Sequence, residues 1–425
     1  MTMTSRTSEA RRSFLAAMAI DSVAAGVSQP ATIIFLLATT HLGLPAIGSA
    51  LTVAGLVALP VGLWSGRVVD ELGPKPVLML ANVAQTVGVT GYLVLHSFWG
   101  VVACAWVATS GRQAFFGTFG VALSAMTRPG ERERWFGRVG GVRNLGQAAG
   151  GLIAGVALAV GSPAAYTALI VLTAASFLAA VPLMRQLPSP TRAADAPAVS
   201  QQSWASVLRD RPYRIVVAHW MTFAFSGNVL TVAIPVYAAV LLGLPGWVAG
   251  AAFTLNTLLI GFGQNGVVRR LHGRVRSRVM AASHVGFAAG YVVLLGASLA
   301  HGAIAIVILM AGVAVYTLGE TVGWPVSSAL GAEAAPSEVR GRYLALTQLA
   351  GSTAGAAAPA ILASLLALGA AATWVPLLGV CAAGAGCAAL AGRHVEAAST
   401  RIGRSPMSRD EPELAATLNA GNSDD

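Results

Sequence analysis

The chain has 425 residues, of which 55% are hydrophobic and only 10% are charged. Soluble proteins carry roughly 25% charged residues, so a chain of this length cannot cover a water-facing surface with so few charges. The composition therefore excludes a soluble globular protein and indicates an integral membrane protein. The formal net charge of +10 is compatible with nucleic-acid binding, but the placement of the charges, described below, argues against that partner.

Twelve apolar runs follow one another along the chain, and each is close to or above the ~20 residues that a membrane-spanning helix needs. The first run is far longer than the core of a signal peptide, so no cleaved signal peptide is expected. The predicted spans are 14–40, 46–66, 76–95, 98–126, 139–160, 163–184, 214–242, 246–268, 278–299, 302–332, 342–368 and 370–392.

A polar stretch at 185–213 contains several prolines and small polar residues and divides the predicted spans six and six, as a linker would. We therefore predict an all-α membrane protein of twelve transmembrane helices. Its expected parts are a cytoplasmic N-terminus at 1–13, a six-helix bundle at 14–184, the linker, a second six-helix bundle at 214–392 and a disordered cytoplasmic tail at 393–425.

The positive charges lie on one side of this predicted topology. Nearly every arginine and the single lysine, Lys75, fall in or beside the termini and every second connection. By the positive-inside rule both termini are cytoplasmic, and the protein is a multi-pass protein of the cell (inner) membrane. The basic stretch at 269–278 then faces anionic lipid headgroups rather than nucleic acid. The connections on the opposite side carry no Lys or Arg and lie at 41–45, 96–97, 161–162, 243–245, 300–301 and 369.

Short motifs of the first half recur in the second half at a separation of roughly 200 residues, as in transporters built from structural repeats. The recurrence predicts that the two six-helix bundles are related by pseudo-symmetry. The matching motifs are Gly66-x-x-x-Asp70-x-x-Gly73 with Gly266-x-x-x-Arg270-x-x-Gly273, and Thr109-x-Gly111-Arg112 with Thr317-x-Gly319-Glu320.

The segment GRVVDELGPKP at 66–76, between the second and third predicted spans, resembles the signature of the major facilitator superfamily. This resemblance implies the twelve-helix major facilitator fold and a transporter that works by alternating access. It also implies that Asp70 docks near the start of the eleventh span when the cytoplasmic side is closed. The gating motif that the resemblance assigns consists of Gly66, Asp70, Gly73 and Lys75. The second copy carries Arg270 where an acid is expected, so it is not assigned this role.

Two further stretches resemble the proton-coupled drug exporters of that superfamily. Arg112, with Gly117 and Gly120 later in the same span, is similar to the arginine motif of the fourth span. The segment RNLGQAAGGLIAG at 143–155 is similar to the glycine-rich motif of the fifth span of antiporters. The latter has Ala149 and Gly150 where the usual motif has glycine and proline. The resemblance implies export by a proton antiporter, whereas ordinary helix packing is the alternative reading of the glycines.

Three charged residues lie well inside predicted spans: Asp21, Arg112 and Glu320. Burying a charge in a membrane costs about 2.5–3.5 kcal/mol on insertion scales, so such residues are candidates for proton coupling or substrate binding. A carboxyl that alternates between apolar and wet surroundings binds and releases a proton, so the acids are candidate proton carriers. A structural ion pair of Asp21 with Arg112, or attraction of a cationic substrate by an acid, remains open.

Further polar residues inside spans are candidates for the lining of a central cavity, although each could instead form a hydrogen bond between helices. Trp220, Phe223, Phe225 and Trp324 are candidates for an aromatic lining. The three cysteines lie in apolar runs and are interpreted as small apolar residues, so neither a disulfide framework nor a metal site is expected. No cofactor is expected either. The polar cavity-lining candidates are Gln29, Asn144, Gln147, His219, Asn228 and Asn256.

An enzyme is not expected. The single lysine follows Pro74, which rules out a phosphate loop of the GxxxxGK type, and the sequence contains no HxxxxD acyltransferase pattern. The expected partners are a small-molecule substrate, protons and the lipid bilayer, and a monomer is expected. Proton-coupled efflux of a drug-like or natural-product substrate is the preferred function. An importer or uniporter of a nutrient or metabolite, and a non-transporting membrane scaffold, are the alternatives.

Overall fold

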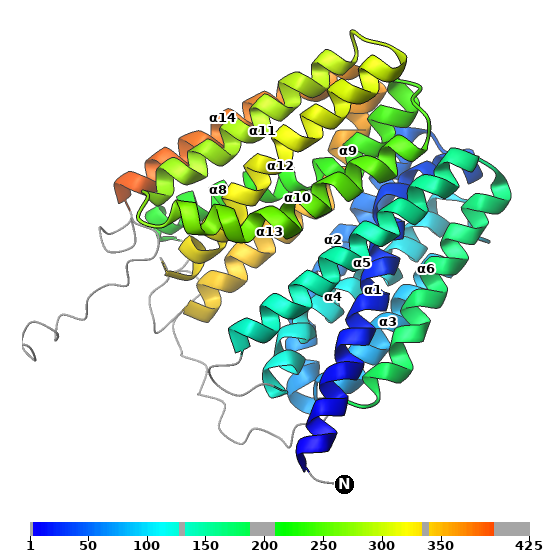
Figure 1. Cartoon of the computed structure of the whole chain (residues 1–425), viewed down its shortest axis with the longest axis vertical. Helices are drawn as coiled ribbons and strands as arrows, with labels where there is room; N and C mark the ends of the chain where they lie inside the picture. The colour runs from blue at the N-terminus through cyan, green and yellow to red at the C-terminus, as the bar shows by residue number, and fades with distance from the viewer. Residues whose placement is uncertain (1–2, 127–131, 188–208, 334–339, 395–425) are drawn as a thin grey trace, which may run out of the picture.

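The computed structural model describes residues 3–126, 132–187, 209–333 and 340–394, which form helices and short connections without any strand (Figure 1). The first half contains six helices, and the second begins with one continuous segment made of two α-helices and a π-helical turn. The elements are α1 (Met3–Thr39), α2 (Leu44–Leu72), α3 (Pro74–Gly91), α4 (Phe98–Ala125), α5 (Arg132–Val160), α6 (Pro163–Met184), α8 (Arg211–Gly227), α9 (Val229–Val236), η1 (Tyr237–Leu241), α10 (Trp247–Leu271), α11 (Arg276–Ala297), α12 (Gly302–Glu333), α13 (Arg340–Ala367) and α14 (Ala370–His394).

When α8, α9 and η1 are counted as one segment, the described residues contain six segments in each half, as predicted. Eight of these segments are long and apolar enough to cross a membrane by length and composition alone. The other four, α3, α4, α5 and α10, contain polar residues such as Gln85 and Arg112 and pack within the same two bundles. The expected all-α membrane fold is therefore confirmed.

Helix contacts repeat between the two halves. In the first half α4 packs against α2 and α3, and α1 packs against α5 and α6. In the second half α12 packs against α10 and α11, and α8 packs against α13 and α14. These contacts correspond one to one when the first span is matched with the seventh, the second with the eighth and so on. The pseudo-symmetry predicted from the motifs is thus present in the packing.

The glycines shared by the two repeat motifs occupy the same backbone conformation. Gly73 ends α2 with φ of 81° and donates its N–H to the Val69 carbonyl at 2.8 Å, and Gly273 in the equivalent turn has φ of 76°. Residues with a side chain are strained at such positive φ values. Gly73 therefore allows α3 to begin immediately after α2, and the same requirement explains the glycine at the matched position.

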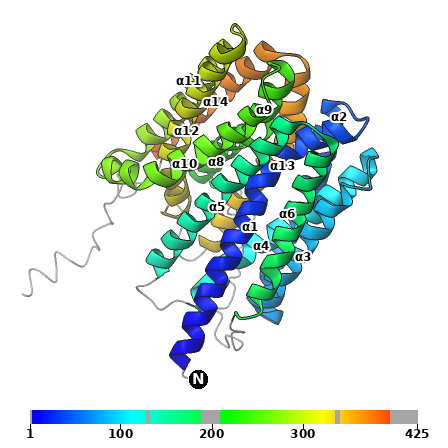
Figure 2. The same cartoon turned by 45° about the vertical axis from the view of Figure 1, so that its right-hand side comes forward.

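The two ends of the molecule differ. We call the end with the connections 40–43, 92–97, 161–162, 242–246, 298–301 and 368–369 the short-loop end, and the opposite end, where α1 begins and α6 finishes, the linker end. The bundles converge at the short-loop end and diverge toward the linker end in both views (Figures 1 and 2). Under the predicted topology the linker end is cytoplasmic.

Contacts between the bundles explain the convergence at the short-loop end. The Ala360 N–H of α13 donates to the Thr52 hydroxyl of α2 at 2.9 Å. On the other side of the molecule, a Cβ on Gly250 of α10 would overlap backbone atoms of Gly151 and Gly155 of α5. Small residues thus let α5 and α10 approach with their backbones in contact, as is common between membrane helices.

At the linker end the same helices separate. α5 and α10 lie together near the short-loop end and run apart toward the linker end in Figures 1 and 2. Consistent with this, a side chain added at Gly140 of α5 or at Gly266 of α10 would meet no atom of the described residues within 4 Å. The structure is therefore closed at the short-loop end and open at the linker end.

Helix ends differ from the predicted spans in a few places. The first helix begins at Met3 rather than at residue 14, so it continues into the segment predicted as an N-terminal extension. The predicted linker is shortened at both sides, since residues 185–187 form turns and α8 begins at Arg211. Residues 188–208 of that linker and the predicted tail from 395 lie outside the described residues.

Candidate functional site

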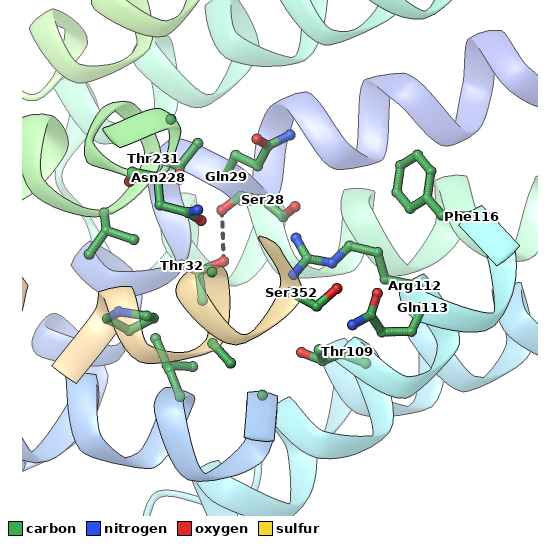
Figure 3. A pocket seen from close by; sticks show the side chains of 18 of the residues that line it. Ser28, Gln29, Thr32, Thr109, Arg112, Gln113, Phe116, Asn228, Thr231 and Ser352 are labelled. Carbon is green, nitrogen blue, oxygen red and sulfur yellow. Dashed lines mark hydrogen bonds between the residues drawn. The ribbon is translucent and has the colours of Figure 1, made fainter. Parts of the chain in front are cut away.

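A cavity of about 630 Å³ lies between the two bundles and is lined by residues of both. Its size falls in the range of roughly 300–1,000 Å³ that is typical of small-molecule sites. Hydroxyl and amide side chains predominate among its polar groups, as Figure 3 shows for part of the lining. The polar lining residues are Ser28, Gln29, Thr32, Gln85, Tyr92, Thr109, Arg112, Gln113, Asn228, Thr231, Glu320, Gln348 and Ser352.

The repeated motif places one charge from each bundle in this cavity. A Cβ on Gly111 of α4 would come within 2.5 Å of the Ala81 carbonyl oxygen of α3, and one on Gly319 of α12 within 2.7 Å of the Ser283 carbonyl oxygen of α11. Each glycine therefore faces a neighbouring helix of its own bundle. The residue that follows each glycine, Arg112 or Glu320, lines the cavity.

Glu320 stands where the central cavity meets a second one. A smaller cavity of about 160 Å³ lies between α1, α5, α9 and α10, and Glu320 lines both. Asn256 of α10 donates from Nδ2 to Glu320 Oε2 at 2.8 Å and to the Thr317 hydroxyl at 3.0 Å. In the described part of the chain, no arginine, lysine or histidine forms an ion pair with Glu320. Its carboxyl group is thus held by an amide rather than by a cation.

Asp21 lies outside both cavities. The close packing of α1 on α5 explains its position, since a Cβ on Gly146 would come within 2.8 Å of Ser22 Cβ. Arg143, one turn before Gly146, contributes electrostatically to the surroundings of Asp21, although the two side chains do not form an ion pair within 4 Å. The alternative pairing of Asp21 with Arg112 is not formed. Asp21 is only 4% exposed, and its Oδ1 atom has no hydrogen-bond partner in the described residues.

Arg143 also lies over two aromatic rings. Its guanidinium carbon lies 4.8 Å from the ring centre of Phe116 and 5.9 Å from that of Phe119. Its Nη1 atom is buried without a hydrogen-bond partner in the described residues. Arg143 belongs to the glycine-rich motif, but the sequence offered no signal that it lies near Asp21, because the register of α1 on α5 depends on tertiary contacts.

His219 also lies away from both cavities. Its ring nitrogens are 3.0 Å from the Ser327 hydroxyl and 3.3 Å from the Gly384 carbonyl oxygen, inside the second bundle. The ring of His284 lies 4.9 Å away, centre to centre. His219 is therefore a packed histidine with hydrogen-bonding partners on α12 and α14.

The other polar candidates line cavities. Gln29 lines both, Asn228 lines the central one, and Asn144, Gln147 and Asn256 line the smaller one. Three further amides of the central cavity, Gln85, Gln113 and Gln348, were not singled out from the sequence, although a polar amide within a span is a usable signal.

The gating motif lies at the linker end of α2. A side chain added at Gly66 would meet no atom of the described residues within 4 Å, and Gly73 forms the tight turn into α3, near whose start Lys75 lies. The side chains of Asp70 and Arg342 lie outside the described part of the structure, so the expected docking of Asp70 at the start of the eleventh span stays a prediction.

Three of the four aromatic candidates form one group on the second bundle, whereas Phe225 packs against the apolar core and does not line the central cavity. The ring of Trp220 lies 5.4 Å from that of Trp324 and 5.9 Å from that of Phe223, and all three line the central cavity. Among the described residues, no three His, Cys, Asp or Glu side chains come together in a way that could hold a metal ion.

Comparison with known proteins agrees with this architecture. The sequence profile of the Major Facilitator Superfamily matches residues 14–359. No curated protein matches the sequence significantly. Among solved structures, the chain is similar to a mutant of the nucleoside transporter NupG, with 13% sequence identity, a TM-score of 0.67, and coverage of 90% of this chain and 98% of that one. It is also similar to an autoinhibited POT family peptide transporter, with 14% identity, a TM-score of 0.69, and coverage of 91% and 97%.

Proposed function

Because the chain belongs to the major facilitator superfamily, a family of membrane transporters rather than enzymes, we propose that it is a secondary active transporter that exports a drug-like or natural-product molecule in exchange for protons. The substrate occupies the central cavity, and the protein works as a monomer in the cell membrane with both termini in the cytoplasm. The position of Glu320 carries the proposal, because this carboxyl lines both cavities and is held by an amide without a neighbouring cation.

The two bundles provide the moving parts. In alternating access, one bundle rocks against the other around a site near the middle of the membrane. The structure corresponds to the state open at the linker end, and the opposite state requires separation of α2 from α13 and of α5 from α10. Carboxyl groups hold protons in apolar surroundings and lose them beside water. Rocking exposes Glu320 to water first on one side and then on the other, which couples proton movement to substrate movement.

The energy of this exchange is sufficient. One proton that crosses a membrane potential of 100 mV releases about 2.3 kcal/mol, which supports roughly a fifty-fold gradient of a neutral substrate.

An importer or uniporter of a nutrient is the second candidate. It is favoured by the departure of the fifth span from the exporter motif at Ala149 and Gly150. Both functions use the same cavity and differ in direction and coupling.

A flux experiment separates these functions. The purified chain is reconstituted in vesicles and tested against a panel of drugs and metabolites, with and without a pH gradient and an uncoupler. Uphill export that the uncoupler abolishes is the expected result. Import, or movement that is independent of the proton gradient, favours the second candidate. Absence of flux for every compound that binds indicates a non-transporting scaffold.

A further inference from the structure

Arg112 presents its guanidinium group to the central cavity. Its side chain is exposed to the cavity and points toward the hydroxyl-bearing residues of α1 and α13, as Figure 3 shows. Among the residues that the structure describes, Arg112 forms no hydrogen bond and no ion pair. Its labelled neighbours in the cavity include Ser28, Thr32 and Ser352, which are all uncharged.

An unpaired arginine in the middle of a membrane protein needs an explanation. An intramembrane charge costs about 2.5–3.5 kcal/mol on insertion scales, so it is retained where it binds something. Arginine binds carboxylate and phosphate groups through two parallel N–H donors. The cavity's own described acid, Glu320, belongs to the opposite bundle and is held by Asn256. The guanidinium is therefore available to an anionic group that enters with the substrate.

The second bundle offers the complementary surface. Trp220 of α8 and Trp324 of α12 line the same cavity, and their rings lie 5.4 Å apart. Trp324 is 50% exposed and lines the cavity. Exposed indole rings favour flat apolar partners that stack on them or meet them edge to face.

We propose that the substrate is an aromatic organic anion whose carboxylate binds Arg112 and whose ring packs against Trp220 and Trp324. This proposal rests on the proposed transport function and specifies its substrate class. The anionic group contacts the first bundle and the ring contacts the second. Such a substrate bridges the two bundles across a cavity of about 630 Å³.

Equilibrium binding to the purified full-length chain in detergent tests this assignment. Isothermal titration compares naphthylacetate with the neutral naphthylacetamide and the cation naphthylethylamine, which share the ring and differ in charge. Phenyl phosphate distinguishes a carboxylate from a phosphate preference, and acetate tests whether the ring is needed. We expect naphthylacetate to bind more tightly than the amide or the amine, and acetate not to bind measurably.

Variants locate the site. Arg112→Gln removes the charge, and a hydrogen bond to a charged group is worth about 1.5–3 kcal/mol, so the Kd of naphthylacetate should rise roughly ten-fold or more. The Kd of naphthylacetamide should stay unchanged. Arg274→Gln, at an exposed arginine in the turn after α10, is the matched control and should leave both values unchanged. Trp324→Ala should raise the Kd of naphthylacetate and the Kd of naphthylacetamide by the same factor.

Several outcomes overturn the proposal: no binding of naphthylacetate to the unchanged chain, tighter binding of naphthylethylamine or of phenyl phosphate, or an Arg112→Gln variant that binds the acid normally. If Arg112→Gln does not fold, Arg112→Lys retains the charge without the paired donors and should show an intermediate loss for the acid alone. Binding in detergent needs no proton gradient. A chain that binds the acid but does not pump therefore contradicts the proposed function and leaves this assignment standing.

Discussion

Asn256 donates a hydrogen bond of 2.8 Å from Nδ2 to Oε2 of Glu320 and so links α10 to α12 at the boundary between the two cavities. The same nitrogen donates to the Thr317 hydroxyl at 3.0 Å. The amide therefore has both of its N–H groups bound and can hold the carboxyl group in one orientation. In the proposed cycle this orientation decides which cavity the proton reaches.

Removal of this amide should weaken coupling. Asn256→Ala should lower uphill efflux roughly ten-fold, because hydrogen bonds to charged groups contribute about 1.5–3 kcal/mol, whereas downhill exchange should persist. Thr317→Val is the matched control, since it removes the other acceptor of Asn256 and leaves the bond to Glu320. Equal losses in the two variants, measured in vesicles with a pH gradient, would show that the bond to Glu320 has no special role.

The glycine contact between α5 and α10 should control closure of the short-loop end. A Cβ on Gly250 would overlap backbone atoms of Gly151 and Gly155, so Gly250→Val should prevent the closed contact and favour the opposite state. Crosslinking of cysteine pairs placed across that end should decrease. Gly379→Val, where a side chain would meet no atom of the described residues within 4 Å, is the control and should crosslink normally. Unchanged crosslinking in Gly250→Val would show that the glycine contact between α5 and α10 does not control closure of the short-loop end.

Asp21 and Arg143 should be coupled in stability. Each has a buried atom without a hydrogen-bond partner in the described residues, and loss of one charge leaves the other uncompensated. Asp21→Asn and Arg143→Gln should each lower stability by about 1–3 kcal/mol, and the double variant should lose less than the sum. Thermal unfolding in detergent measures the stability of the unchanged chain, the two single variants and the double variant. Strict additivity would show that the two charges do not interact.

Topology is directly testable. In a chain whose natural cysteines are replaced by alanine, Ser162→Cys and Gly369→Cys should react with an impermeant thiol reagent from outside the cell. Ser189→Cys should react only after the membrane is opened. This orientation is expected because the arginines are concentrated at the linker end, and positively charged connections stay on the cytoplasmic side of a membrane. Labelling of Ser189→Cys in intact cells would reverse the orientation.

Sequence patterns predicted the fold well because they reflect strong local requirements. A span needs a long apolar run, and the turn after α2 needs a glycine, which explains why Gly73 and Gly273 marked the repeat before any contact was known. The same repeat aligned Arg112 with Glu320, and the cavity contains both. Burial cost alone identified these two charges as unusual.

Other parts of the site depend on contacts that a sequence does not specify. The charged neighbour of Asp21 is Arg143 because Ser22 packs on Gly146, a register that side-chain shape decides between helices far apart in the chain. His219 is as polar as the residues that line the cavities, but its side chain lies inside its own bundle, beside Ser327. A polar residue on a helix in lipid can face either a neighbouring helix or the cavity, and its type does not distinguish the two.

Uphill efflux by Glu320→Gln tests the central claim most directly, because glutamine keeps the shape of the side chain and cannot carry a proton. Vesicles loaded with substrate are given a pH gradient, and export is compared with downhill exchange in the same preparation. Glu9→Gln, at an exposed carboxylate near the start of α1, serves as the control. The account predicts that Glu320→Gln loses uphill export and retains exchange, while the control keeps both. Normal uphill export by Glu320→Gln would contradict proton coupling through this residue.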